Sequence, residues 1–331
     1  MNVRELPKVE LHRHLELSIR KSTLVELAPH FGFDVSTEKA FRHHFLIEEP
    51  MKDLGSVLNK FLDTQKLLAS PEILERVAYE ACEDAFKLEN IRVLELRYAP
   101  TFVIMNHPNL SFESIHQSFV KGIEKAQKEF NMAVGLICII QRILPVKEAE
   151  HVTEFAIENK DTFIALDLAD DEDGFDSKPF SPFFSKAKKA GLGITVHSGE
   201  ANKPKAAWWV KDAIDYLGAD RIGHGVRIYN EPEMIEYVKA KNITLELCPT
   251  SNYFTNAVEK IEDHPFRQLM EAGVKTTINT DDPGIFGIDL NHEYETLIKY
   301  HNFTEKELNH CADLAAQASF IAKEKIQQVW G

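Results

Sequence analysis

Three histidines and an aspartate have the types and spacing needed to hold a metal ion. His12 and His14 are two residues apart, so on a β-strand both imidazoles point to the same face. A lone pair of this kind is more often solvated or part of a core than a metal site. His197 and Asp281 each follow a short apolar segment farther along the chain. The four residues together offer imidazole nitrogens and a carboxylate oxygen, a donor set that suits zinc and leaves room for a water.

Two further residues are placed where they can handle protons. Glu200 comes three residues after His197, close to the predicted ion without ligating it, and there it can carry and deliver a proton. The alternative role for Glu200 is to cap the following helix. His224 lies between Gly223 and Gly225, which allow a sharp turn and leave the imidazole free to approach a bound water. A hydrogen-bonded core histidine is the alternative here.

The doublet Asp281-Asp282 has a structural alternative as well. Pro283 follows it, and a proline at the first position of a helix often comes after a capping residue. Either aspartate can act as that cap. Asp282 fills the role as well as Asp281, so the doublet leaves Asp281 available as a ligand.

These residues need a scaffold that brings distant segments together. Short β-branched, apolar segments alternate with stretches that have apolar residues at helical spacing. Eight such strand candidates span residues 9–12, 92–97, 134–140, 163–167, 193–197, 221–224, 243–247 and 275–279. Eight alternations fit a closed barrel better than an open sheet. The prediction is an α/β protein, a (β/α)₈ TIM barrel formed by residues 1–331 as a single domain.

The candidate residues gather at one end of the predicted barrel. The polar residues at or just past the C-terminal ends of strand candidates are His12, His14, Arg97, Asp167, His197, His224, Asp281 and Asp282. Active sites of this barrel are built at that end. The stretch 22–70 exceeds an ordinary connection and predicts additional helices that cover the C-terminal mouth. Further helix is expected after residue 291.

Composition excludes several other classes of protein. The formal charge is −14, from 38 basic and 52 acidic residues, which argues against a nucleic-acid partner. The apolar run 132–140 is far shorter than the roughly 20 residues that a membrane helix needs. The four cysteines are scattered without a CxxC pair, so we expect reduced thiols and a cytoplasmic protein. Nothing in the sequence fixes the oligomeric state.

Several of these segments together resemble the adenosine deaminase family. The matching segments are LPKVELHRHL (6–15), ELRYAP (95–100), TVHSGE (195–200), RIGHG (221–225), CPTSN (248–252), HPF (264–266) and INTDDP (278–283). They occur in the family's order and span nearly the whole chain. Each piece is unspecific alone, but the combination is highly specific.

The resemblance implies a TIM barrel that holds one zinc ion through His12, His14, His197 and Asp281. It further implies that Glu200 protonates purine N1, that His224 orients the metal-bound water, and that Asp282 bonds N7. Asp281 or His224 can take the proton of the water. The implied reaction is the zinc-dependent hydrolysis of adenosine, a small-molecule purine nucleoside, to inosine and ammonia.

The sequence departs from the family's pattern on the sugar side of the expected site. The family's Asp that contacts the ribose 5′-hydroxyl is replaced by Glu16, and Leu17 stands where glycine is usual. Asp170 occupies a position where the family commonly has glycine, whose backbone N–H bonds purine N3. An alternative for residues 170–173 is a solvated acidic loop.

A further segment aligns with a lid helix that covers the ribose in nucleoside deaminases. Val57, Leu58 and Phe61 can share one face of that helix, and we expect them to contact substrate. Plain core packing is the alternative role for the three residues.

The sequence leaves several other functions open. The nearest is the same chemistry on free adenine or a 5′-modified adenosine, because Glu16 and Leu17 depart from the family. An AMP-type substrate is disfavoured, since the motifs bring no Lys or Arg cluster for a phosphate. A two-metal amidohydrolase usually needs a bridging lysine, and the strand ending at Asp167 offers none. A barrel that binds without catalysis is disfavoured, because every residue that the chemistry requires is present.

Overall fold

The computed structural model describes residues 1–51 and 55–331, and the side chains of 55–58 are outside the description. Eight parallel strands form one sheet in which neighbours in sequence are neighbours in space. The strands are β1 (Lys8–His14), β2 (Ile91–Tyr98), β3 (Ala133–Gln141), β4 (Phe163–Ala169), β5 (Gly193–Ser198), β6 (Arg221–His224), β7 (Thr244–Leu247) and β8 (Lys275–Ile278). All eight predicted strands are confirmed.

The sheet closes where its last strand meets its first. Arg13 and Asp281 form a parallel bridge. The backbone N–H of His14 donates to Asp281 O at 2.8 Å, and Asp281 N–H donates to His12 O at 3.0 Å. These bonds complete a (β/α)₈ barrel and confirm the predicted fold class. They also bring three of the predicted site residues to the same seam.

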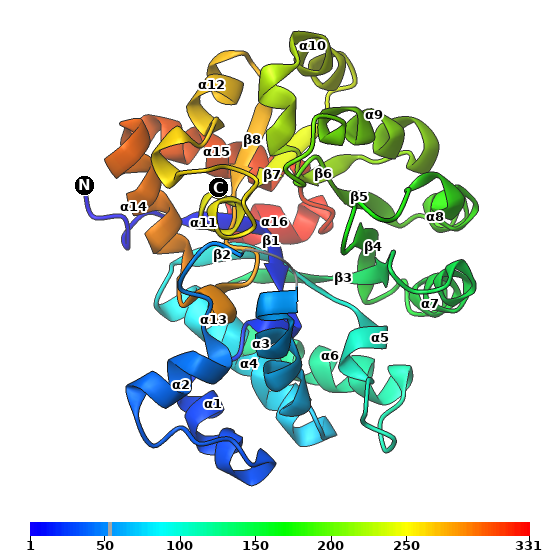
Figure 1. Cartoon of the computed structure of the whole chain (residues 1–331), viewed down its shortest axis with the longest axis vertical. Helices are drawn as coiled ribbons and strands as arrows, with labels where there is room; N and C mark the ends of the chain where they lie inside the picture. The colour runs from blue at the N-terminus through cyan, green and yellow to red at the C-terminus, as the bar shows by residue number, and fades with distance from the viewer. Residues whose placement is uncertain (52–54) are drawn as a thin grey trace.

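Helices surround the strands, as Figure 1 shows. They are α1 (Lys21–Leu27), α2 (Glu38–Phe45), α3 (Gly55–Lys66), α4 (Pro71–Lys87), α5 (Pro100–Val103), α6 (Phe112–Glu129), α7 (Val146–Glu158), α8 (Ser181–Lys189), α9 (Ala206–Leu217), α10 (Pro232–Ala240), α11 (Pro249–Phe254), α12 (Phe266–Glu271), α13 (Pro283–Phe286), α14 (Leu290–His301), α15 (Glu305–Ala318) and α16 (Lys323–Val329). Strand residues are buried on both faces, as expected when helices cover a parallel sheet.

Of the extra helices predicted to cover the C-terminal mouth, α3 lies at that end, because its Phe61 packs with Leu17, after β1, and with Ile285 and Phe286, after β8. Figure 1 shows α1, α2 and α3 grouped to one side of the strand ring. Two main-chain bonds fasten the segment before α3: Ile47 N–H donates to Ile285 O at 2.9 Å, and Met51 N–H donates to Phe254 O at 2.7 Å. We call this segment, residues 47–51, the cover segment. The chain after residue 291 is helical too, as expected from the sequence.

The chain after α15 packs against the other end of the barrel. The Phe320 ring lies 3.8 Å from the guanidinium carbon of Arg221, at the first residue of β6. Arg221 is buried among the strands and pairs with Glu95 and Glu246. The Phe320 ring thus packs against the buried start of β6 at the N-terminal end of the barrel, opposite the predicted site.

Two expectations from composition can be compared with the structure. None of the described helices has the length and apolar content needed to cross a membrane. All four cysteines are buried, and no disulfide joins them.

The contact between α4 and α6 depends on a glycine. A Cβ at Gly122 would lie 2.2 Å from Glu75 O and 2.9 Å from the Cβ of Ala78. Gly122→Ala should therefore lower the free energy of unfolding by about 1–3 kcal/mol, measured by urea denaturation. Lys121→Ala, at an exposed position of the same helix, is the control and should stay within about 0.5 kcal/mol of the parent. Equal stability of the two variants would contradict the close approach of the helices.

Candidate active site

The four predicted metal ligands converge at the C-terminal mouth of the barrel. His12 and His14 come from β1, His197 from β5, and Asp281 from the loop after β8. His12 Nε2 lies 3.1 Å from Asp281 Oδ1, and His14 Nε2 lies 3.2 Å from the same oxygen. His14 Nε2 and His197 Nε2 are 3.3 Å apart. Residues nearly 270 positions apart in sequence thus place their donor atoms around one point.

Buried carboxylates hold the outer nitrogens of two of these histidines. His12 Nδ1 lies 2.8 Å from Glu246 Oε2, and His197 Nδ1 lies 3.1 Å from Asp167 Oδ1. Each contact directs Nε2 inward, which is how metal-binding histidines are usually oriented. Arg97 donates to both carboxylates, to Asp167 Oδ2 at 2.8 Å and to Glu246 Oε2 at 2.7 Å. The two imidazole supports are therefore linked through one guanidinium.

The electrostatics of the mouth favour a cation there. Burial lowers the pKa of His14, but the Asp282 and Asp281 carboxylates outweigh it and raise that pKa to about 9. Burial lowers the pKa of His197 to about 3 against the opposing effect of Asp167, so this ring is neutral. A neutral imidazole is the form that binds a metal. The proton on His14 occupies the place between carboxylates that a metal cation would take.

The segment after β7 orients two of the predicted residues. Ser251 Oγ donates to Asp281 Oδ2 at 2.6 Å. Asn252 Nδ2 lies 3.0 Å from His224 Nδ1. Neither partner was recognised from the sequence, although both lie in the CPTSN segment. The signal was a polar run directly after a strand, at the end where the site forms.

Glu200 lies at the edge of the ligand cluster and caps no helix. Its Oε2 is 3.4 Å from His224 Nε2, and Thr255 Oγ1 donates to its Oε1 at 2.7 Å. The next helix, α9, begins six residues later at Ala206, which excludes the capping alternative. The Glu200 side chain is 24% exposed, so it can meet a ligand that enters from the mouth.

Asp281, His224 and Asp170 share an unusual backbone conformation. Their φ angles are 67°, 62° and 80°, in the left-handed region that few residues other than glycine adopt. The other described non-glycine residues with positive φ are all asparagines. Strain of this kind collects where a side chain must be aimed at a ligand. At Asp170 this conformation suits the glycine that the resemblance implies at this position.

Asp282 and Gly223 also fit the predicted arrangement. Asp282 precedes α13, but its side chain makes no capping bond. Burial and the adjacent Asp281 raise the pKa of Asp282 well above its ordinary value. A Cβ at Gly223 would lie 2.9 Å from His12 Cε1, so this glycine lets the ligand ring lie against β6.

The alternative of a solvated acidic loop at 170–173 is wrong for one residue. Asp171 and Asp173 are exposed, but Glu172 is buried. Its carboxylate accepts backbone N–H bonds from Gly199 at 2.8 Å, Glu200 at 2.6 Å and Ala201 at 2.5 Å. Glu172 therefore fixes the turn that carries Glu200. Sequence reasoning missed this role because the partners are backbone groups of another loop.

The residues predicted to contact the sugar side of the substrate differ in their surroundings, and two of them lie outside the described side chains. Glu16 is buried, and its Oε1 accepts the Ala99 N–H at 3.0 Å. Phe61 is half-buried in an apolar cluster at the mouth that also contains Leu17 and Phe254. The side chains of Val57 and Leu58 lie outside the described part of the chain. The roles predicted for Glu16, Asp170, Val57, Leu58 and Phe61 stay predictions.

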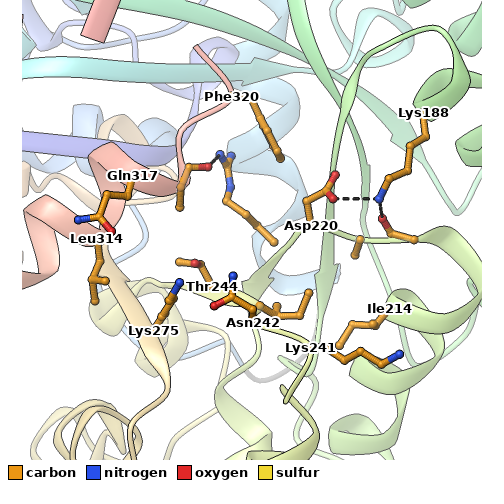
Figure 2. Close-up of a pocket in the computed structure, with 15 residues that line it drawn as sticks. Lys188, Ile214, Asp220, Lys241, Asn242, Thr244, Lys275, Leu314, Gln317 and Phe320 are labelled. Carbon is orange, nitrogen blue, oxygen red and sulfur yellow. Dashed lines mark hydrogen bonds and ion pairs between the residues drawn. The ribbon is translucent and has the colours of Figure 1, made fainter. Parts of the chain in front are cut away.

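A separate cleft of about 510 Å³ opens at the other end of the barrel (Figure 2). It lies where β6, β7 and β8 begin and is lined by Lys241, Lys275 and Phe320 among others. Lys188, also in its lining, pairs with Asp220 at 2.9 Å. None of the predicted site residues lines this cleft.

The sequence matches known proteins over nearly its whole length. A family model described as adenosine deaminase matches residues 7–330. The adenosine deaminase of Shewanella loihica is 35% identical over 319 residues, which cover 96% of this chain and 95% of that protein. The adenosine deaminase of Pectobacterium atrosepticum is 34% identical over 326 residues, with 98% and 95% covered.

Solved structures show the same architecture. The N6-methyl-AMP deaminase of Arabidopsis thaliana superposes with a TM-score of 0.83 at 29% identity, and 99% of this chain and 96% of that chain are covered. The adenine deaminase of Arthrobacter aurescens superposes with a TM-score of 0.86 at 24% identity, with 98% of each chain covered. The latter likeness supports the fold alone.

The role of Glu172 can be measured without any ligand. In Glu172→Gln the amide N–H₂ faces a backbone N–H, so at least one of the three bonds is lost. We expect the amides of residues 199–201 to exchange hydrogen about tenfold faster, measured by NMR, since a bond to a charged group contributes about 1.5–3 kcal/mol. Asp171→Asn, at the exposed neighbouring position, is the matched control and should leave these rates unchanged. Unchanged exchange in Glu172→Gln would contradict the assigned contacts.

Proposed function

The chain belongs to the adenosine deaminase family, and from this premise we propose that it hydrolyses adenosine to inosine and ammonia with one bound zinc ion. The observation that carries the proposal is the meeting of His12, His14, His197 and Asp281, with Glu200 beside them. The family match over residues 7–330 also supports the proposal that residues 1–331 form one domain. Location in the cytoplasm stays a prediction.

The residues present fit a zinc ion. His12 Nε2 is buried and has no hydrogen-bond partner among the described residues, although its Nδ1 is held by Glu246. Donor atoms placed tetrahedrally at zinc–ligand distances of about 2.0–2.1 Å lie about 3.3 Å from one another. The three separations from Asp281 Oδ1 to His12 Nε2 and His14 Nε2 and between His14 Nε2 and His197 Nε2, 3.1–3.3 Å, agree with that spacing. His12, His197 and Asp281 each also have a donor atom within 4.8 Å of His224. We propose His12, His14, His197 and Asp281 as the ligands.

His12, His14, His197 and Asp281 would hold the zinc ion, which would supply a water acidic enough to act as a nucleophile at neutral pH. The protein's own side chains carry out the proton transfers. Thr255 and the Glu172-held turn fix Glu200, which we propose gives a proton to purine N1. That proton lets the ring accept the charge that attack at C6 creates. Asp281 or His224 takes the proton of the water and passes it to the amino group, which leaves as ammonia.

Asp282 is suited to the other side of the ring. Purine N7 can only accept a hydrogen bond, so its partner needs a proton. Burial and the charge of Asp281 raise the pKa of Asp282 above the usual range for an aspartate, which favours the protonated form. We propose that the neutral acid donates to N7 and fixes the base in the orientation that presents C6.

Charge at the mouth favours a nucleoside over a nucleotide. Glu16 and Asp170 bring carboxyl groups to the substrate side, and each would repel a phosphate when ionised. Arg142 lies beneath, but it donates to the carbonyl oxygens of His197 and Leu168. The alternative is the same chemistry on free adenine or a 5′-modified adenosine, because Glu16 is turned toward the Ala99 N–H.

Glu200→Gln tests the proton path. We expect kcat for adenosine to fall by about 10²–10⁴-fold, since a glutamine cannot deliver the proton, while the zinc content per chain stays the same. Both are measured on one preparation, by loss of adenosine absorbance and by elemental analysis. Glu233→Gln, at an exposed position in α10, is the control and should keep full activity. Near-normal turnover in Glu200→Gln would remove Glu200 from the mechanism.

A substrate panel tests the proposed specificity. The zinc-loaded protein is assayed with adenosine, adenine, 5′-deoxyadenosine and AMP. We expect adenosine to have the highest kcat/KM and AMP the lowest, because of the carboxylates at the mouth. A chelator should abolish all turnover, and added zinc should restore it. Faster turnover of adenine would favour the alternative, and faster turnover of AMP would contradict the electrostatic argument.

A further inference from the structure

A chain of hydrogen bonds runs behind His224, away from the ligand cluster. The Phe266 backbone N–H donates to His264 Nδ1 at 3.2 Å, and His264 Nε2 lies 3.1 Å from Asn252 Oδ1. Asn252 Nδ2 in turn lies 3.0 Å from His224 Nδ1. All four residues are buried. They come from the CPTSN and HPF segments and the end of β6, and the proposed function gives Asn252 and His264 no role.

The first bond fixes the direction of every bond that follows. A backbone N–H can only donate, so His264 Nδ1 must accept and carries no proton. The proton of the neutral ring is then on Nε2, which donates to the carbonyl oxygen of Asn252. The amide nitrogen of Asn252 is left to donate to His224 Nδ1. Burial, with His301 and His224 nearby, lowers the pKa of His264 to about 3, so the ring is neutral as this direction requires.

The last bond decides which nitrogen of His224 carries a proton. Because Nδ1 accepts from Asn252, the neutral ring is protonated on Nε2. That nitrogen faces the reaction site, 3.4 Å from Glu200 Oε2 and 3.9 Å from Asp281 Oδ2. An imidazole held in this form donates a hydrogen bond into the site and has no lone pair there to accept a proton.

We propose that Asn252 and His264 are positioning residues that hold His224 as the neutral tautomer protonated on Nε2. His224 then acts as a hydrogen-bond donor toward the attacking oxygen and not as the base. This inference rests on the proposed function for its chemistry. Of the two acceptors considered for the proton of the water, it selects Asp281.

Asn252→Asp is the sharpest test. An aspartate has no N–H, so it accepts from both histidines and places the proton of His224 on Nδ1. The tautomer is read from the ¹⁵N resonances of the histidines in the zinc-loaded protein, and the His224 signals are assigned by their loss in His224→Gln. We expect an unprotonated Nδ1 in the parent, a protonated Nδ1 in Asn252→Asp, and a fall in kcat of about 10²-fold or more with a smaller change in KM.

Variants at position 264 test the tautomer of His224 independently of Asn252→Asp. His264→Leu removes the donor to Asn252, so its amide can turn over and we expect both tautomers of His224. His264→Gln keeps an N–H donor and should restore a single tautomer and most of kcat. His301→Gln is the control, because His301 is buried beside His264 but its side chain bonds only to Ile261 O within the described chain.

The outcomes separate the two proposals. A protonated Nδ1 on His224 in the parent would overturn the direction of the chain. An unchanged tautomer in both Asn252→Asp and His264→Leu would overturn the positioning role. The expected resonances in a protein inactive on every purine tested would support the chain while rejecting the proposed function.

Discussion

A network of charges buried inside the barrel is the constraint on which the site depends. Glu246 receives Arg97 and His12 on one oxygen and Arg221 and Thr195 on the other. Buried charges are tolerated only when each is paired and hydrogen-bonded, so these side chains have little freedom. The same pairs that satisfy the interior also orient the ligand rings. The order of the candidate metal ligands therefore follows from the pairing of the buried charges beneath them.

The backbone conformation at the strand ends is the second constraint on the site. The barrel strands bring each side chain to the mouth, but they do not determine its orientation. Left-handed backbone at His224 and Asp281 turns these side chains off the strand direction, and the bridge between Arg13 and Asp281 holds the turn in place. The local cost of such a conformation, about 1–3 kcal/mol per residue, is carried by the surrounding hydrogen bonds.

Much of this could be predicted from the sequence, because its signals are local. Alternating apolar segments identified all eight strands, and polar residues at strand ends identified the four candidate ligands. The supports could not be predicted this way. Glu246 lies within a strand segment, and its partners come from four other strands. A solvated loop was an alternative for Glu172, and its buried role could not be predicted because its hydrogen-bond donors are backbone amides 27 to 29 residues away, which no residue type reveals. The predicted substrate contacts at 57 and 58 lie outside the described side chains.

The cover segment is attached through main-chain atoms. The bonds from Ile47 to Ile285 and from Met51 to Phe254 use groups that every residue except a proline donor supplies. Ile47 is also buried in the apolar cluster at the mouth, so the exposed Glu48 and Glu49 are the positions of this segment that can change while its attachment stays intact. A scaffold built in this way can acquire new preferences among purines by changing what lines its entrance, without disturbing the chemistry beneath.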